Sequence, residues 1–263
     1  MAGPTSSRVI GDLTFQEVGT ALSATSILCL AMGSMEQHGP HLPLNTDTVL
    51  AEAFTGRIVE CWGEAYDLWR LPPLAVGLSR EHAWAPGTLS LSVAGMTAHL
   101  RDLGREIARA LPVRNLLIVN GHGGNRGILE ALGRELCDDF GLNICALHLG
   151  AMMSPASDSA IPEIHAGKDE TSAMLALAPH LVRRDRMAQL KASPDSASAR
   201  SLILDLATSW PWGSDDRRIA AEGVIGDAQG ASAEHGKTIV ARVVEATGEV
   251  LKQLRDNQKA ANG

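Results

Sequence analysis

Four short apolar runs along the chain predict buried β-strands. They cover residues 26–32, 71–76, 116–119 and 144–149. Each run lacks a helical period and is followed by glycine or polar residues, which is typical of a strand that ends in a loop.

Amphipathic helices are predicted between and after these strands. Apolar residues recur at steps of three and four over residues 96–111, 128–136 and 239–254. This spacing places them on one helix face. Strands that alternate with such helices predict an α/β fold, with a mainly parallel sheet covered by helices on both faces in three αβα layers.

The chain is expected to form one domain over residues 1–263, because no obvious linker divides it. A Ser- and Ala-rich stretch over residues 193–201 is interpreted as a mobile connection. Hydrophobic residues make up 45% of the chain and charged residues 20%, which predicts a packed globular protein.

The charge and the start of the chain restrict its partners and its compartment. A net charge of -7 argues against nucleic acid as a partner, because phosphate binding needs clustered Lys and Arg. The first residues do not resemble a secretory signal, and no run approaches the roughly 20 apolar residues of a membrane helix. We therefore expect a cytoplasmic protein that does not enter a membrane.

The four cysteines do not predict a metal or redox motif. None is part of a Cys-x-x-Cys pair, which argues against a zinc knuckle. Cys29 and Cys145 lie in apolar runs and are interpreted as buried, unreactive thiols.

Polar segments that can bind metal follow the predicted strands. They are GSMEQHGPH, GLSREHAW, NGHGGN and, after a longer loop, IPEIHAGKDE. Open parallel sheets bind ligands beyond the carboxyl ends of their strands, so these segments are expected at one edge of the sheet. All four contain histidine and three contain a carboxylate.

The first segment offers three candidate metal ligands. Glu36 and His38 are two positions apart in a loop, and Asp47 follows where a helix should begin. The alternatives are that Asp47 only caps this helix and that His38 only forms loop hydrogen bonds.

His122 lies in the glycine-rich segment between the third strand and the next helix. Such a loop could bind phosphate through its backbone N–H groups. It lacks the Lys-Ser/Thr ending of a P-loop and the spacing of a dinucleotide fingerprint, so His122 is interpreted as a metal ligand.

His165 and Glu170 lie five positions apart at the start of a predicted helix. Glu170 falls in the first helical turn, where its charge is favourable even without a metal. Together, these histidines and carboxylates suit zinc, manganese or iron(II), with coordination positions left for water and substrate.

The segments GSMEQHGPHLPLNTD, NGHGGN, HAGKDETS and GDAQGASAEHGK resemble the creatininase family, and the likeness covers residues 26–240. It implies that four residues bind metal, with Asp47 as a bridge between two ions. They are Glu36, His38, Asp47 and His122.

The chain departs from creatininase proper at one ligand. Creatininase has a metal-binding Glu two residues after the loop histidine, where this sequence has Gly124. The resemblance implies that Glu170 replaces this ligand. The departure argues against creatinine itself as the substrate.

The resemblance further implies hydrolysis of a C–N amide bond with one or two divalent ions. The metal would lower the pKa of water and polarise the substrate carbonyl. His165 and Glu170 are the expected catalytic residues, with His165 as the proton donor to the leaving nitrogen.

The expected substrate-binding residues are Ser79, His82, Trp84 and Gly123. His82 could instead fix its own loop. Family members pack tryptophan on flat substrates, but core or subunit-interface packing is the preferred interpretation of Trp84, Trp210 and Trp212.

The predicted function is metal-dependent hydrolysis of a small, cyclic amide or a formamide. One alternative is a metallopeptidase that trims a short peptide, and another is a catalytically silent metal-binding homologue. By resemblance, we also expect a homo-oligomer, with a hexamer as the expected form.

Overall fold

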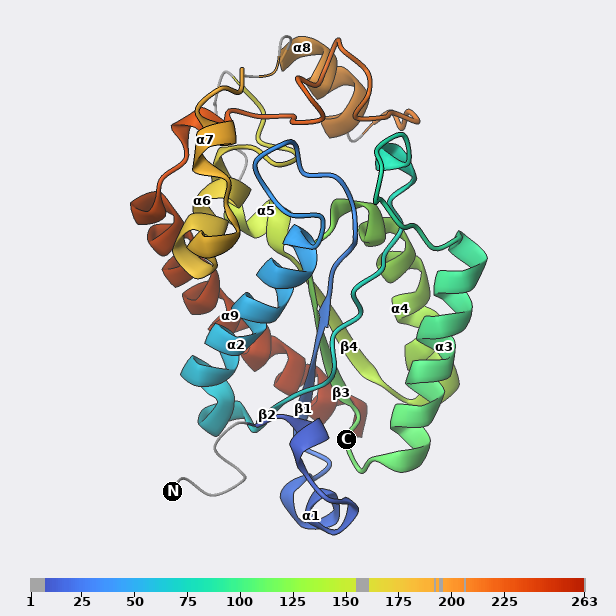
Figure 1. The fold of residues 1–263 in the computed structure, drawn as a ribbon. Helices are drawn as coiled ribbons and strands as arrows, with labels where there is room; N and C mark the ends of the chain where they lie inside the picture. Colours follow the sequence, from blue (N-terminus) through green and yellow to red (C-terminus); the bar gives the residue numbers. More distant parts are fainter. Residues whose placement is uncertain (1–7, 155–160, 192, 194–195, 206, 263) are drawn as a thin grey trace.

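The computed structural model describes residues 8–154, 161–191, 193, 196–205 and 207–262. Within these residues, the centre of the protein is a parallel sheet with the strand order β2-β1-β3-β4 (Figure 1). The strands are β1 (Ile27–Met32), β2 (Leu68–Arg70), β3 (Asn115–Asn120) and β4 (Asn143–His148). The expected α/β fold with a parallel sheet is confirmed.

The second strand lies earlier in the chain than the apolar pattern predicted. It covers Leu68–Arg70, whereas the predicted run was 71–76, of which Leu74 forms an isolated bridge with β1. Pro72 and Pro73 explain the difference, because proline has no backbone N–H to donate to a neighbouring strand. The other three strands are confirmed, with boundaries shifted by one residue.

Helices α3 (Val93–Ala110) and α4 (Arg126–Phe140) cover one face of the sheet (Figure 1). Their apolar sides pack against alternate side chains of the strands, in a core cluster that contains Leu30 of β1 and Met96 of α3. Both helices were predicted from their helical period.

Helices α2 (Thr46–Tyr66), α6 (Lys168–Leu177) and α9 (Ala233–Asn262) lie on the other face. Phe54 of α2 and Ile239 of α9 are fully buried in the core cluster on this side. Two helical layers therefore enclose the sheet, which confirms the three-layer αβα arrangement.

Short helices complete the described part of the chain. They are η2 (Ile10–Asp12), α1 (Phe15–Ala21), η3 (Arg80–His82), η4 (Gly123–Asn125), α5 (Leu149–Met153), η5 (Pro179–Leu181), α7 (Arg184–Met187), α8 (Ser196–Ala199), η6 (Arg200–Leu204) and η7 (Ala228–Gly230). The expected connection over residues 193–201 lies partly outside the described residues. Where it is described, it contains α8 and the beginning of the π-helical η6.

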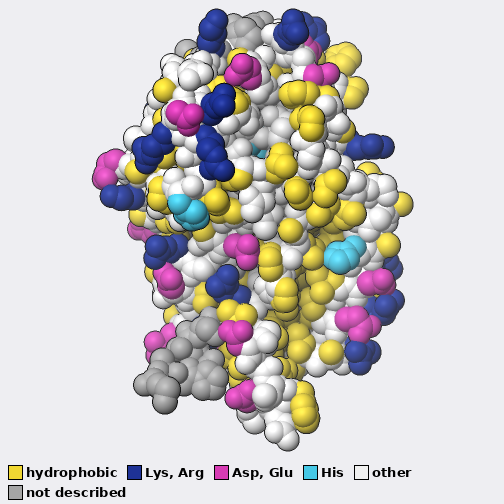
Figure 2. All heavy atoms as spheres, in the orientation of Figure 1, with side chains coloured by type: hydrophobic (Ala, Val, Ile, Leu, Met, Phe, Trp, Pro, Cys, Tyr) yellow, Lys and Arg dark blue, Asp and Glu magenta, His cyan; other side chains and the backbone are white. Residues whose placement is uncertain are grey.

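The surface mixes all classes of side chain. On the face shown in Figure 2, hydrophobic side chains form a band along the middle, and basic and acidic side chains are interspersed around it. Among the described residues, no helix is both long and apolar enough to span a bilayer.

The first turn of α2 lies directly against the ends of two strands. A Cβ atom at Gly33 would lie 2.4 Å from the backbone nitrogen of Thr48, and one at Gly121 would lie 2.3 Å from the carbonyl oxygen of Asp47. Such distances exclude any side chain, so glycine at both positions allows the close approach. The fold thereby brings Asp47 to the carboxyl ends of β1 and β3.

Candidate metal centre

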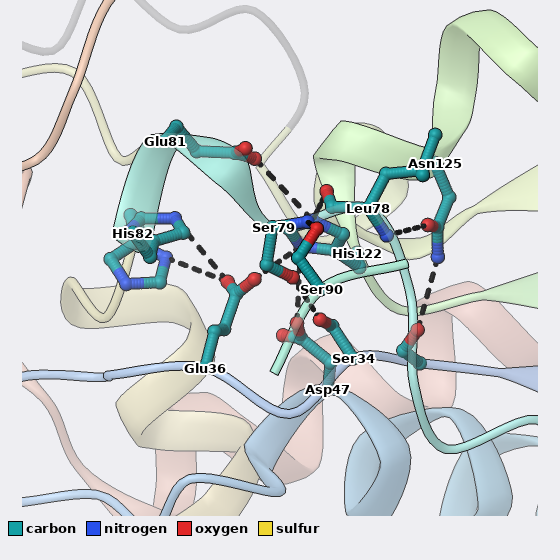
Figure 3. Close-up of polar contacts among 12 residues, drawn as sticks. Ser34, Glu36, Asp47, Leu78, Ser79, Glu81, His82, Ser90, His122 and Asn125 are labelled. Atoms are coloured by element: carbon teal, nitrogen blue, oxygen red, sulfur yellow. Dashed lines mark hydrogen bonds and ion pairs between the residues drawn. The ribbon is translucent and has the colours of Figure 1, made fainter. Parts of the chain in front are cut away.

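Four polar side chains form one buried cluster at this edge of the sheet. Glu36 and His38 come from the loop after β1, Asp47 from the first turn of α2, and His122 from the residues directly after β3. Each is at most 4% exposed. Figure 3 shows Glu36, Asp47 and His122 pointing toward a common centre.

Asp47 lies between two imidazoles. Its Oδ1 is 3.0 Å from Nε2 of His38, and its Oδ2 is 3.1 Å from Nδ1 of His122. The N-cap residue of α2 is Asn45, so Asp47 is not the helix cap that the sequence left as an alternative. The two oxygens of Asp47 therefore face different histidines.

Glu36 faces three histidines. Its Oε2 is 3.2 Å from Nδ1 of His122, while its Oε1 is 3.4 Å from Nε2 of His82 and 3.7 Å from Nδ1 of His165. The region around Glu36 is therefore rich in ring nitrogens.

Three carboxylate oxygens in the cluster are buried without a hydrogen-bond partner among the described residues. They are both side-chain oxygens of Glu36 and Oδ2 of Asp47. Burying a carboxylate has a penalty on the order of several kcal/mol unless a positive charge compensates for it, and in the metal-free protein a protonated histidine is the available charge. A divalent cation supplies that compensation, and histidine nitrogens with carboxylate oxygens are the donors it prefers. The residues present therefore fit a metal.

The two histidines beside Asp47 hold protons tightly in the metal-free protein. Burial lowers the pKa of His38, but the negative charges of Asp47, Glu170 and Glu36 together outweigh burial and raise this pKa to about 9. Burial also opposes protonation of His122, but Glu36 and Asp47 raise its pKa well above the ordinary value. Conversely, His38 keeps the pKa of Asp47 below its usual range in spite of burial. Cations and protons thus compete for the same atoms.

Glu170 joins the cluster from the first turn of α6. Atoms of Glu170, His38 and Asp47 that could bind one ion lie within 4.8 Å of one another. The Oε2 atom also accepts a 2.6 Å hydrogen bond from the backbone N–H of Ala166. Burial raises the pKa of Glu170 to about 7, although His38 counteracts the rise. Glu170 therefore lies in the first turn of α6 and is also close enough to His38 and Asp47 to bind the same ion.

His165 lies next to the carboxylates and is held by its neighbours. Its ring stacks on His82 with 4.1 Å between centroids, and its Nε2 donates a 2.8 Å hydrogen bond to the carbonyl oxygen of Gln37. Burial keeps the pKa of His165 well below its ordinary value, and His82 and His38 lower it further. These causes favour the neutral form of the His165 ring.

A cavity of about 590 Å³ opens onto the cluster. It is lined by Asp47, His122, His165 and Glu170, by the cations Arg80 and Arg126, and by the apolar residues Ile164, Ile203, Leu204, Trp210, Pro211 and Trp212. Its volume is in the range of pockets that bind small molecules.

The residues expected to bind substrate occupy different places. His82 and Gly123 line this cavity. Ser79 is fully buried, and its hydroxyl is hydrogen-bonded to the hydroxyl of Ser34. Trp84 lines a separate surface hollow, where its Nε1 donates a 2.8 Å hydrogen bond to Ser214.

The three tryptophans were expected to pack in the core or at a subunit interface, and the structure excludes the core for two of them. Trp84 is 48% exposed and Trp210 is 55% exposed, because both lie in loops beyond the strand ends. Trp212 is partly buried, and its ring meets His82 edge-on at 6.0 Å between centroids.

Two residues near the cluster were not singled out from the sequence. Glu81 places its Oε1 3.4 Å from Nε2 of His122 (Figure 3). Burial would raise the pKa of Glu81, but the contact with His122 lowers it below the ordinary value. Gln37 donates through its side-chain amide to Ser214 and to the carbonyl of Gly223. Both residues lie in the polar segments that follow predicted strands. This position is the sequence signal that could have identified them.

Comparison with known proteins gives consistent matches over most of the chain. A family model described as "Creatininase: Creatinine amidohydrolase" matches residues 11–251. A mycofactocin precursor peptide peptidase from Mycobacterium ulcerans (strain Agy99) is 32% identical over 249 residues, which cover 90% of this chain and 89% of that protein. A creatinine amidohydrolase from Pseudomonas putida is 31% identical over 267 residues, which cover 93% of this chain and 96% of that protein.

A solved structure described as "Creatininase Mn" superimposes with a TM-score of 0.75 at 28% identity. The superposition covers 94% of this chain and 98% of that chain. The two folds therefore agree over nearly their whole lengths.

Proposed function

The chain belongs to the creatininase family, and from that premise we propose that it hydrolyses a small cyclic amide or a formamide at the cluster around Asp47. At the coarser level, the chain is a metal-dependent amidohydrolase that acts on carbon–nitrogen bonds with a divalent cation. The observation that carries the proposal is the burial of the Glu36 and Asp47 carboxylates against the ring nitrogens of His38 and His122, with three carboxylate oxygens that make no well-formed hydrogen bond among the described residues.

The ligand atoms support two cation positions that share Asp47. Glu36, Asp47 and His122 would hold one cation, and His38, Asp47 and Glu170 would hold the other. When bound, a divalent cation lowers the pKa of water and polarises a substrate carbonyl. Zinc, manganese and iron(II) all suit this donor set.

His165 is the proposed proton carrier. Because its Nε2 donates to the carbonyl of Gln37, its Nδ1 holds the lone pair on the side of Glu36. The neutral ring can accept a proton at Nδ1 from the attacking water and then give that proton to the leaving nitrogen of the amide. The stacked ring of His82 restricts rotation of His165 and so keeps Nδ1 on this side.

The cavity supports a small substrate with an apolar surface. Trp212 and Ile203 offer apolar contacts on the lining, and Arg80 offers a positive charge for an anionic group. Gly123 exposes its backbone to the cavity and can approach a polar substrate atom closely.

A turnover assay tests this proposal. The purified protein, loaded with zinc or manganese, is incubated with creatinine, other cyclic amides, N-formyl compounds and short peptides, before and after chelation. We expect hydrolysis of a cyclic amide or formamide that chelation abolishes and metal restores. The variant His122→Ala should be inactive, whereas His99→Ala, which changes an exposed histidine of α3, should match the wild type. Metal binding without any turnover would favour a catalytically silent homologue.

Trimming of a short peptide is the second candidate function. It is favoured by the 32% identity to the mycofactocin precursor peptide peptidase over 90% of the chain. Arg80 on the cavity lining could also pair with the carboxylate of a peptide C-terminus. Cleavage of peptides without cleavage of the small amides in the assay would select this candidate.

Self-assembly is part of the proposal. Exposed apolar side chains such as Phe15, Trp84 and Trp210 support it, because large exposed apolar residues often mark contact surfaces. The expected hexamer and the expected cytoplasmic location remain predictions from the sequence. Light scattering after size-exclusion chromatography measures the number of subunits directly.

A further inference from the structure

Glu81 lies beside His122, on the ring side opposite the proposed cation. It belongs to η3, one residue before His82, and its side chain is 17% exposed on the cavity lining. Its Oε1 is 3.4 Å from Nε2 of His122. The other ring nitrogen, Nδ1, faces Glu36 and Asp47.

A backbone carbonyl determines which nitrogen of His122 carries hydrogen. Nε2 lies 2.8 Å from the carbonyl oxygen of Leu78, which can only accept a hydrogen bond. Nε2 therefore donates to Leu78, so the proton that His122 gives up on binding a cation is the one on Nδ1, which faces the oxygens of Glu36 and Asp47. The tautomer that remains is the one that a cation bound at Nδ1 requires.

Gly124 keeps the space beside this nitrogen free for Glu81. A Cβ atom at position 124 would lie 2.6 Å from Oε1 of Glu81, 2.5 Å from Nε2 of His122 and 2.3 Å from the carbonyl oxygen of Leu78. No side chain at position 124 fits next to these atoms. The residue that stands where creatininase proper has a metal ligand is thus the one that admits the carboxylate of Glu81 to His122.

We infer that Glu81 is a positioning residue for the metal centre, which acts on the cation through His122. Metal-binding histidines usually donate their second ring N–H to a carboxylate or a carbonyl, and this contact fixes the ring and strengthens nitrogen as a ligand. Leu78 supplies the carbonyl and Glu81 the negative charge. The inference rests on the proposed function, because it takes His122 as a ligand.

Zinc affinity of the full chain tests the inference. Metal-free wild type, Glu81→Gln and Glu81→Asp are titrated with zinc in competition with a chromophoric chelator. Loss of such an outer carboxylate typically weakens metal binding about 10- to 100-fold, and we expect this loss for Glu81→Gln. Glu81→Asp keeps the charge and should regain part of the affinity. Glu64→Gln, an exposed change on α2, is the matched control and should bind like the wild type.

The outcomes separate this inference from the proposed function. If His122→Ala keeps wild-type zinc affinity, the proposed metal centre is wrong. If His122→Ala loses zinc while Glu81→Gln stays within about twofold of the wild type, only the role of Glu81 is overturned. Equal losses in Glu81→Gln and Glu81→Asp would also overturn it, because the charge would then not matter.

A glycine pair gives a second test that leaves Glu81 unchanged. Gly124→Ala inserts a methyl group against Glu81 and Leu78, and it should weaken zinc binding. Gly127→Ala should not weaken it, because apart from the chain neighbours and the backbone of its own helix no described atom lies within 4 Å of the new methyl group. Wild-type zinc affinity in a folded Gly124→Ala variant would contradict the proposed use of this space.

Discussion

The carboxylate of Asp47 and the imidazole of His38 are nine positions apart in the sequence and meet in a buried 3.0 Å hydrogen bond between Oδ1 and Nε2. Neither side chain is exposed, and the second oxygen of Asp47 faces His122. In the metal-free protein burial lowers the pKa of His38, but this contact, with the charges of Glu170 and Glu36, raises it to about 9. The same nitrogen is a proposed metal ligand, so protonation and metal binding exclude each other there.

Metal binding should therefore release protons. At pH 7.5 the metal-free protein holds a proton on His38, which must leave before Nε2 can bind a cation. We expect calorimetric zinc titrations in buffers of different ionisation enthalpy to show release at pH 7.5 and less release above pH 9. Equal heats in all buffers at pH 7.5 would contradict the protonated state of His38.

The stability of the metal-free protein should depend on pH in a defined direction. The folded pKa of His38 lies above its ordinary value of 6.5, so its stabilising contribution is complete below pH 6.5. This contribution disappears as the pH rises through about 9. We expect the melting temperature of the metal-free protein to fall over this interval, and to fall less in His38→Gln. A melting temperature that rises toward pH 9 would contradict the raised pKa of His38.

His165 and His122 should differ in what their removal abolishes. His165→Ala should keep its metal and lose about 100- to 10,000-fold in rate, the usual range for a general acid–base residue. His122→Ala should lose metal and activity together. Elemental analysis and kcat on the same preparations check both, and a fully active His165→Ala would remove His165 from the mechanism.

The sequence could predict the strands β1, β3 and β4 and the position of Asp47, because these depend on local patterns. An apolar run gives a strand, and a helix begins after the loop that contains Gly39 and Pro40. The contact between Glu81 and His122 depends on the orientation of η3 relative to the loop after β3, which no local pattern records. The sequence shows that a metal ligand is missing at Gly124, but only the structure shows the space that this glycine leaves for Glu81.

The packing of α9 against α6, the helix that carries Glu170, should be sensitive to a single added methyl group. A Cβ atom at Gly236 of α9 would lie 1.9 Å from the carbonyl oxygen of Ser172 in α6. Gly236→Ala should lower the free energy of unfolding by about 1–3 kcal/mol, the usual cost of overpacking. Urea denaturation measures this change.

Gly133→Ala is the matched control for this substitution. Gly133 lies in α4, and apart from its chain neighbours and the backbone of its own helix no described atom is within 4 Å of the added methyl group. The change should raise the free energy of unfolding by about 0.5–1 kcal/mol, because alanine favours helix over glycine. If Gly236→Ala also raised the free energy of unfolding by a similar amount, α6 and α9 would not be in such close contact.

Anomalous diffraction at the zinc edge from crystals of the zinc-loaded protein tests the central claim most directly. We expect anomalous peaks about 2.0–2.2 Å from the Asp47 carboxylate, with one of them at a similar distance from Nδ1 of His122. Zinc peaks elsewhere in the protein, with none in contact with Asp47 or His122, would contradict the claim that this cluster is the metal centre.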